Sequence, residues 1–90
     1  MISETTIWKV RELAIEDVLS PYVRLSRKGS TLMGLCPFHS ENTGSFAVTP
    51  SKNLFHCFSC NRGGDSITFI MEKENLSFSA AVEFICLLYT

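Results

Sequence analysis

The segment LCPFHSENTGSFAVTPSKNLFHCFSCNRGG, residues 35–64, contains two pairs of residues that can bind a metal ion. Two residues separate Cys36 from His39, and two separate Cys57 from Cys60. Zinc prefers four nitrogen or sulfur ligands in a tetrahedron, and two tight turns with two ligands each commonly supply them. We therefore interpret these four residues as a closed, structural zinc site around which the rest of the chain packs.

Cys57 and Cys60 also have the spacing of a redox-active dithiol. A thioredoxin-type motif needs a strand before it, a helix that begins at the first cysteine and a lowered thiol pKa. Here glycines follow the pair and another ligand pair precedes it, so zinc binding is the favoured interpretation. The remaining cysteine, Cys86, lies in an apolar helical stretch and is expected to be a buried free thiol.

Length and composition favour one small globular domain. The 90 residues are 46% hydrophobic and 19% charged, and at this size a structural metal often supplements a thin core. No basic segment followed by an apolar core marks the N-terminus as a secretion signal, so reduced thiols are expected in place of disulfides. The longest wholly apolar run, 84–89, is too short to cross a membrane, and we expect a cytoplasmic protein.

The hydrophobic spacing divides the chain into three parts. A helical lead-in is expected over 5–20, as one helix or two, with Trp8 in the core. The zinc-binding part covers 22–64, and further helices are expected over 65–89. We assign residues 1–90 to a single domain, and because the last helix reaches Thr90 without a stop signal, we expect it to be the N-terminal part of a longer protein.

Short strands are expected within the zinc-binding part. Residues 46–49 and 54–57 have strand-like composition, and the segment 50–53 between them reads as a turn. Another strand is expected over 22–25, followed by a turn over 27–30.

Positive charge is concentrated in the middle of the chain. Residues 22–62 have a net charge of +4, whereas the segments before and after them are acidic. Single-stranded nucleic acid is bound by basic grooves together with aromatic side chains that stack on bases. Alternatively, the phenylalanines fill the core, which is favoured for any single one, and the charges only solvate the surface. The basic residues are Arg24, Arg27, Lys28, Lys52 and Arg62, and the phenylalanines among them are Phe38, Phe46, Phe55 and Phe58.

His56 lies next to a proposed ligand but should not bind the zinc. Neighbouring residues of a strand point to opposite faces, so His56 should face away from the metal if Cys57 faces it. Packing and nucleic-acid contact both remain open for this residue. The sequence contains no Gly-rich phosphate loop, Ser-His-Asp set or carboxylate cluster suited to magnesium, so no catalytic site is expected within these 90 residues.

The run CPFH…T-x-SF-x-V-x-P…HCF-x-C…GGD…LSF…AVE resembles the N-terminal zinc-binding domain of bacterial DnaG-type DNA primases, including their phage and mobile-element relatives. The similarity covers about residues 7–86, and segment 15–35 fits the family's opening helix and strand. The resemblance implies an α+β fold, a small zinc ribbon whose antiparallel sheet is packed by helices. It also implies that Zn²⁺ is structural, with the family's ligands on Cys36, His39, Cys57 and Cys60.

The resemblance further implies a function in replication. In this family the domain contacts single-stranded template DNA and helps to select the start site of the RNA primer. The expected partners are therefore the template, a primase catalytic domain in cis or in trans, and a replicative helicase; the parent protein would be a nucleotidyltransferase. The alternative is a zinc ribbon that docks on another protein and does not bind DNA. The residues expected to bind DNA are Arg24, Arg27, Lys28, Phe46, Lys52, Phe58 and Arg62.

Two positions depart from the pattern of the family. Gly44 stands where proline is usual, which loosens the loop after His39. Asn42 stands where a basic residue is common, which removes one phosphate contact.

Overall fold

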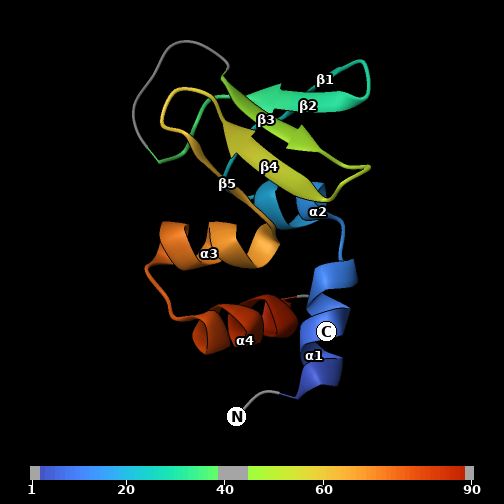
Figure 1. The fold of residues 1–90 in the computed structure, drawn as a ribbon, viewed down its shortest axis with the longest axis vertical. Helices are drawn as coiled ribbons and strands as arrows, with labels where there is room; N and C mark the ends of the chain where they lie inside the picture. The colour runs from blue at the N-terminus through green and yellow to red at the C-terminus, as the bar shows by residue number, and fades with distance from the viewer. Residues whose placement is uncertain (1–2, 39–44, 89–90) are drawn as a thin grey trace.

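The computed structural model describes residues 3–38 and 45–88. Within these residues, a five-stranded antiparallel sheet lies on one side of a helical layer, and its strands follow one another in chain order (Figure 1). This arrangement confirms the expected α+β ribbon with packed helices. The strands are β1 (Ser26–Lys28), β2 (Thr31–Gly34), β3 (Phe46–Thr49), β4 (Leu54–Cys57) and β5 (Arg62–Gly64), and the helices are α1 (Glu4–Glu12), α2 (Ile15–Leu19), α3 (Ser66–Glu74) and α4 (Phe78–Leu88).

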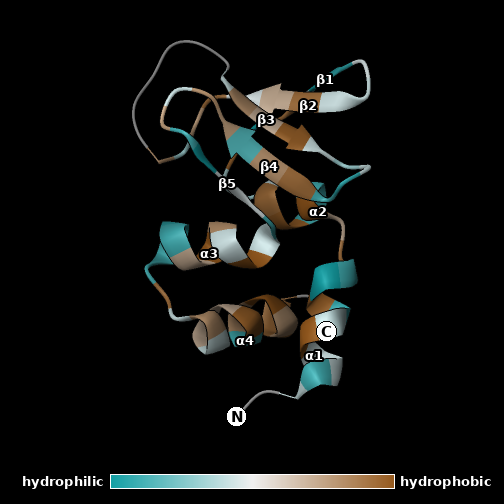
Figure 2. Ribbon diagram, viewed as in Figure 1, coloured by the Kyte–Doolittle hydropathy of each residue, from teal (hydrophilic) through white to brown (hydrophobic). Residues whose placement is uncertain are grey.

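The lead-in forms two helices, α1 and α2. The Ser3 hydroxyl caps α1 by accepting a hydrogen bond from the Thr6 backbone N–H at 3.3 Å. Trp8 does not pack in the core as expected, because its side chain on α1 is 61% exposed. Figure 2 shows that α4 is mostly hydrophobic, whereas both ends of α1 are hydrophilic. None of the helices within the described part of the chain is long and apolar enough to span a bilayer.

The central strands and their turn lie where the sequence places them, but the outer strands do not. β1 starts at Ser26, so the strand expected over 22–25 is wrong. Arg27 and Lys28, expected in a turn, belong to β1, and only Gly29 and Ser30 form the turn. Gly29 has a φ of +66°, which glycine adopts without strain. Sequence patterning also does not predict β5 at the other edge.

The strand register assigns each residue to one face of the sheet. Ser26 pairs with Met33, Met33 with Ala47, Ala47 with His56, and His56 with Gly63. These residues lie on the face of the sheet away from the helices. We call this the outer face; Lys28 lies on it too, two residues after Ser26 on the same strand. The opposite, inner face carries the buried residues Leu32, Phe46, Val48, Phe55 and Cys57.

Phe69 of α3 joins the helices to the inner face. Its fully buried ring packs edge-on against Phe55, with ring centroids 5.5 Å apart, and lies 5.3 Å from the ring of Phe38. The Asp65 side chain caps α3 by accepting from the Thr68 N–H at 2.9 Å. This aromatic cluster therefore buries the inner face of the sheet against the helices, and the helices do not cover the outer face.

Candidate zinc site and nucleic-acid face

Three of the four predicted zinc ligands meet at one end of the sheet. The Sγ atoms of Cys36, Cys57 and Cys60 all lie within 4.8 Å of one another. Cys36 Sγ and Cys60 Sγ are 3.6 Å apart, far beyond the bond length of about 2.0 Å in a disulfide. A tetrahedral zinc with Zn–S bonds of about 2.3 Å places its sulfur ligands about 3.8 Å apart, so the observed spacing fits a zinc ion. His39 lies outside the described residues and stays the predicted fourth ligand.

Backbone turns bring these thiols together. Cys36 follows β2, Cys57 ends β4, and Cys60 lies in the connection to β5. That connection is closed by the Asn61 N–H, which donates to the Cys57 carbonyl at 2.8 Å, and Asn61 takes the left-handed φ of 57°. Cys57 and Cys36 are buried and Cys60 is half-buried, which suits a structural site that admits no substrate.

The thiols differ in acidity because their surroundings differ. Burial, together with the neighbouring thiols, raises the pKa of Cys36 to about 12. Burial also acts to raise the pKa of Cys57, but hydrogen bonds from the backbone N–H groups of Cys60 and Ser59 and from the two other thiols lower it to about 7. A bound metal ion would favour the thiolate form of these cysteines, so metal binding would release protons.

Ser45 is a neighbour of the site that the sequence did not reveal. Its Oγ lies 3.8 Å from Cys57 Sγ and 2.6 Å from the Ser59 hydroxyl. A hydroxyl in this position can donate to the thiolate and so stabilise its charge. The strand register was the missing signal, since Ser45 precedes Phe46, which pairs with Cys57.

The structure contradicts the redox interpretation of Cys57 and Cys60. A strand precedes Cys57 and its pKa is lowered, as in a thioredoxin-type motif, but turn residues and then β5 follow it where the motif requires a helix. Among the described residues the cysteines form no disulfide, and Cys86 is half-buried. Zinc is therefore the structural cofactor expected at this cluster.

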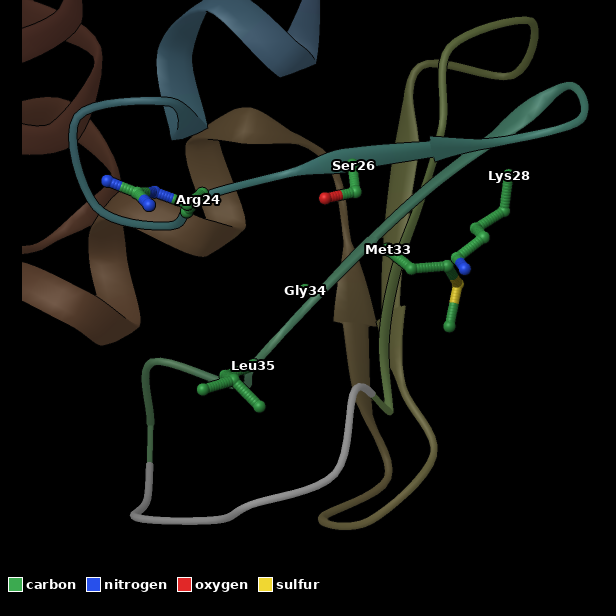
Figure 3. Close-up of a pocket in the computed structure, with 6 residues that line it drawn as sticks. All are labelled: Arg24, Ser26, Lys28, Met33, Gly34 and Leu35. Atoms are coloured by element: carbon green, nitrogen blue, oxygen red, sulfur yellow. The ribbon is translucent and has the colours of Figure 1, made fainter.

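The basic residues predicted to bind DNA do not form one patch. Arg24 and Lys28 line a groove of about 700 Å³ on the outer face, together with Ser26, Met33, Gly34 and Leu35 (Figure 3). Arg27 is exposed but alternates with Lys28 and so projects on the other side of β1. Lys52 is exposed in the turn between β3 and β4.

Arg62 faces the helical layer and lies apart from this groove. Its guanidinium pairs with Glu72 of α3 at 3.4 Å and lies over the ring of Phe38, 5.0 Å from the centroid. Both contacts direct the side chain away from the outer face. Arg62 therefore links β5 to α3 in this structure, and its contact with DNA stays a prediction.

The two phenylalanines predicted to bind DNA have opposite environments. Phe46 is fully buried, so the expectation that its ring meets DNA is wrong: a base cannot stack on a ring inside the core. Phe58 is 69% exposed and packs edge-on against His56 on the outer face, with ring centroids 4.6 Å apart. His56 thus faces away from the zinc cluster, as the strand alternation predicts. Asn42 and Gly44 lie outside the described residues.

Comparisons with known proteins agree with this geometry. The family model described as the CHC2 zinc finger matches residues 2–90. DNA primases of Halalkalibacterium halodurans and Geobacillus stearothermophilus are 47% identical over 83 residues, which are 91% of this chain and 14% of each relative. The DNA primase of Mycobacterium tuberculosis is 51% identical over 84 residues, or 13% of its length. The chain thus spans only a small part of these curated relatives.

A solved structure shows the same fold. The crystal structure of the Aquifex aeolicus primase, comprising its zinc-binding and RNA polymerase domains, matches with a TM-score of 0.87 and 41% sequence identity. The match covers 99% of this chain and 22% of that chain. Because the family model also extends over nearly all of the sequence, we conclude that the chain belongs to the CHC2 zinc finger family, the zinc-binding domain of DnaG-type DNA primases.

Proposed function

We propose that this domain binds the single-stranded DNA template of a primase on the outer face of its sheet. The observation that carries the proposal is the exposed Phe58 ring, which shares that face with the groove lined by Arg24 and Lys28. A basic groove beside an exposed aromatic ring is the arrangement by which proteins hold single strands. The net charge of the whole chain is only −1, but charge local to this face can still attract phosphates.

Zinc would support this function through structure alone. The cysteines that would hold it end β4 and follow β2, two of the strands that form the outer face. The metal, when bound, supplies cross-links between these strands and performs no chemistry on the template. This chain matches only 14% of the length of the Halalkalibacterium halodurans primase. Primer synthesis and the choice of its start site would therefore require other parts of a primase.

A docking function has its own supporting observation. Trp8, Leu87 and Leu88 expose apolar side chains on α1 and α4, in the helical layer away from the outer face. Exposed apolar residues of this size suit contact with another protein, here the catalytic domain of the primase. The two functions use different surfaces and can be tested separately.

The template proposal is tested by the salt dependence of binding to a short single-stranded oligonucleotide. Each phosphate neutralised on a single strand contributes about −0.7 to the slope of log K against log salt. The double variant Arg24→Gln/Lys28→Gln should bind more weakly and lower the magnitude of the slope by about 1.4. Lys9→Gln/Arg11→Gln on α1 removes the same charge and should keep the wild-type slope. A wild-type slope in the first variant would exclude this contact set.

A further inference from the structure

The groove on the β1–β2 hairpin has an apolar floor and a basic residue at each end. Met33, Gly34 and Leu35 form the floor, and Ser26 contributes one hydroxyl (Figure 3). Leu35 is 52% exposed although it directly precedes the buried Cys36. We infer that this groove is a subsite for one nucleotide of single-stranded DNA, with the base on the apolar floor and the flanking phosphates at Arg24 and Lys28. This inference rests on the proposed function.

Close backbone packing gives the groove its shape. Gly34 has no side chain, and a Cβ there would lie 2.6 Å from the carbonyl oxygen of Arg24. The segment before β1 can therefore lie against the end of β2, which sets the edge of the groove at Arg24. Ser26 and Met33 are direct cross-strand partners, so the hydroxyl and the thioether occupy the same stretch of the outer face. Met33 and Gly34 of the floor thus lie on β2, and Leu35 directly follows that strand.

The charges favour a nucleotide within a strand over a free nucleotide. None of the six described residues that line the groove is acidic. Figure 3 shows Arg24 at one end, with its guanidinium turned away from Ser26 and Met33, and Lys28 at the other, with its ammonium group near Met33. A nucleotide inside a strand has a phosphate on each side and can use both cations. A free nucleoside phosphate carries its charge on one side only and would use one of them.

The groove also lies at a useful distance from the exposed aromatic pair. Met33 pairs with Ala47 and Ala47 with His56, so the groove and the His56–Phe58 pair are two strand spacings apart, about 10 Å. Successive bases of one strand could therefore occupy the groove and the Phe58 ring. Since one serine hydroxyl can bond to any base, the groove should accept all four bases with little preference.

The test compares two labelled oligonucleotides of equal length, oligo-dT and an abasic strand with the same phosphates, by fluorescence anisotropy on the zinc-loaded chain. The wild type should bind oligo-dT about three to ten times more tightly than the abasic strand. Leu35→Ser and Met33→Thr should each lower this ratio and keep the salt slope. Leu87→Ser, the same change at a residue of α4 that is 80% exposed, should leave the ratio unchanged.

Each outcome separates the inference from the function on which it rests. If oligo-dT binds but both groove variants keep the wild-type ratio, the subsite is overturned and the template proposal stands. If neither oligonucleotide binds, the proposed function itself fails. If thymidine triphosphate binds as tightly as oligo-dT and shifts the amide signals of Met33 and Leu35, the groove serves a free nucleotide and the assignment to a strand is overturned. Zinc content and circular dichroism verify that each variant is folded.

Discussion

The side-chain oxygen Oδ1 of Asn53 accepts a hydrogen bond from the backbone N–H of Ile15 at 2.8 Å, although the two lie 38 positions apart in the sequence. The Asn53 side-chain amide also donates to the carbonyl oxygens of Arg11 and Leu13, both at 3.0 Å. Ala14, at the N-cap position of α2, provides no side-chain bond of its own. The turn between β3 and β4 therefore supplies the cap for α2 and ties the sheet to the lead-in.

Replacing Asn53 should weaken the fold without touching the zinc cluster. Asn53→Ala removes three hydrogen bonds to backbone groups and places alanine at a φ of 57°, so we expect a loss of about 2–4 kcal/mol in the free energy of unfolding. Urea unfolding of the zinc-loaded chain measures this loss. Lys52→Ala, an exposed neighbour in the same turn, serves as the control. Equal unfolding midpoints for the two variants would show that the Asn53 bonds do not hold the lead-in.

Removing one thiol of the cluster should cost both the metal and the fold. Cys57→Ser replaces a fully buried thiol at the end of β4 and should release zinc and unfold the sheet. Cys86→Ser changes a free cysteine of α4 that lies outside the cluster and should keep a full equivalent of zinc. Metal analysis measures the bound zinc of both variants, and circular dichroism measures whether they are folded. A Cys57→Ser protein that keeps its fold and its zinc would refute the structural role.

The Ser45 hydroxyl should raise the affinity of the cluster for zinc. Ser45→Ala removes the group that lies 3.8 Å from Cys57 Sγ, and outer hydrogen bonds of this kind are worth about tenfold or more in metal affinity. We expect Ser45→Ala to bind zinc about ten times more weakly in competition with a chromophoric chelator. Ser51→Ala, at an exposed position of the β3–β4 turn, should behave as the wild type. Unchanged affinity in Ser45→Ala would mean that the hydroxyl only packs beside the sulfur.

Truncation of Phe58 should weaken DNA binding, whereas truncation of Phe46 should destabilise the fold. Phe58→Ala removes an exposed ring, so it should leave stability unchanged and weaken single-stranded DNA binding by about 1–3 kcal/mol. Phe46→Ala empties a fully buried position and should destabilise the domain by about 3–5 kcal/mol. Thermal unfolding and anisotropy titrations on both proteins separate the two effects. Normal DNA binding by a folded Phe58→Ala protein would remove the ring from the template contact.

Local sequence patterns predicted the two central strands and the cysteine cluster, because these features depend on residues close together in the chain. The strands at Phe46–Thr49 and Leu54–Cys57 stand out by their composition, and the ligand spacing predicted that Cys36 would meet Cys57 and Cys60. β1 and β5 were missed or displaced, because each has only three residues and β5 contains two glycines. Such strands form only because a neighbouring strand offers them hydrogen bonds.

The distribution of the functional residues could not be read from the sequence. Whether a basic side chain lies on the outer face depends on its position in the alternation along the strand. This alternation places Arg27 and Lys28 on opposite faces and directs Arg62 to Glu72. The burial of Phe46 and Phe69 and the exposure of Trp8 likewise depend on which helix covers which face. These are properties of the tertiary arrangement, and composition alone does not contain them.

The central claim is that the outer face of a zinc-held sheet binds single-stranded DNA. An NMR titration of the zinc-loaded chain with a short single strand at low salt tests it most directly, because it detects weak binding and locates it. We predict that amide shifts cluster on Ser26, Lys28, Met33, His56 and Phe58, while those of α1 and α4 stay in place. Shifts confined to α1 and α4, or no shifts at millimolar DNA, would contradict the claim and favour the docking function.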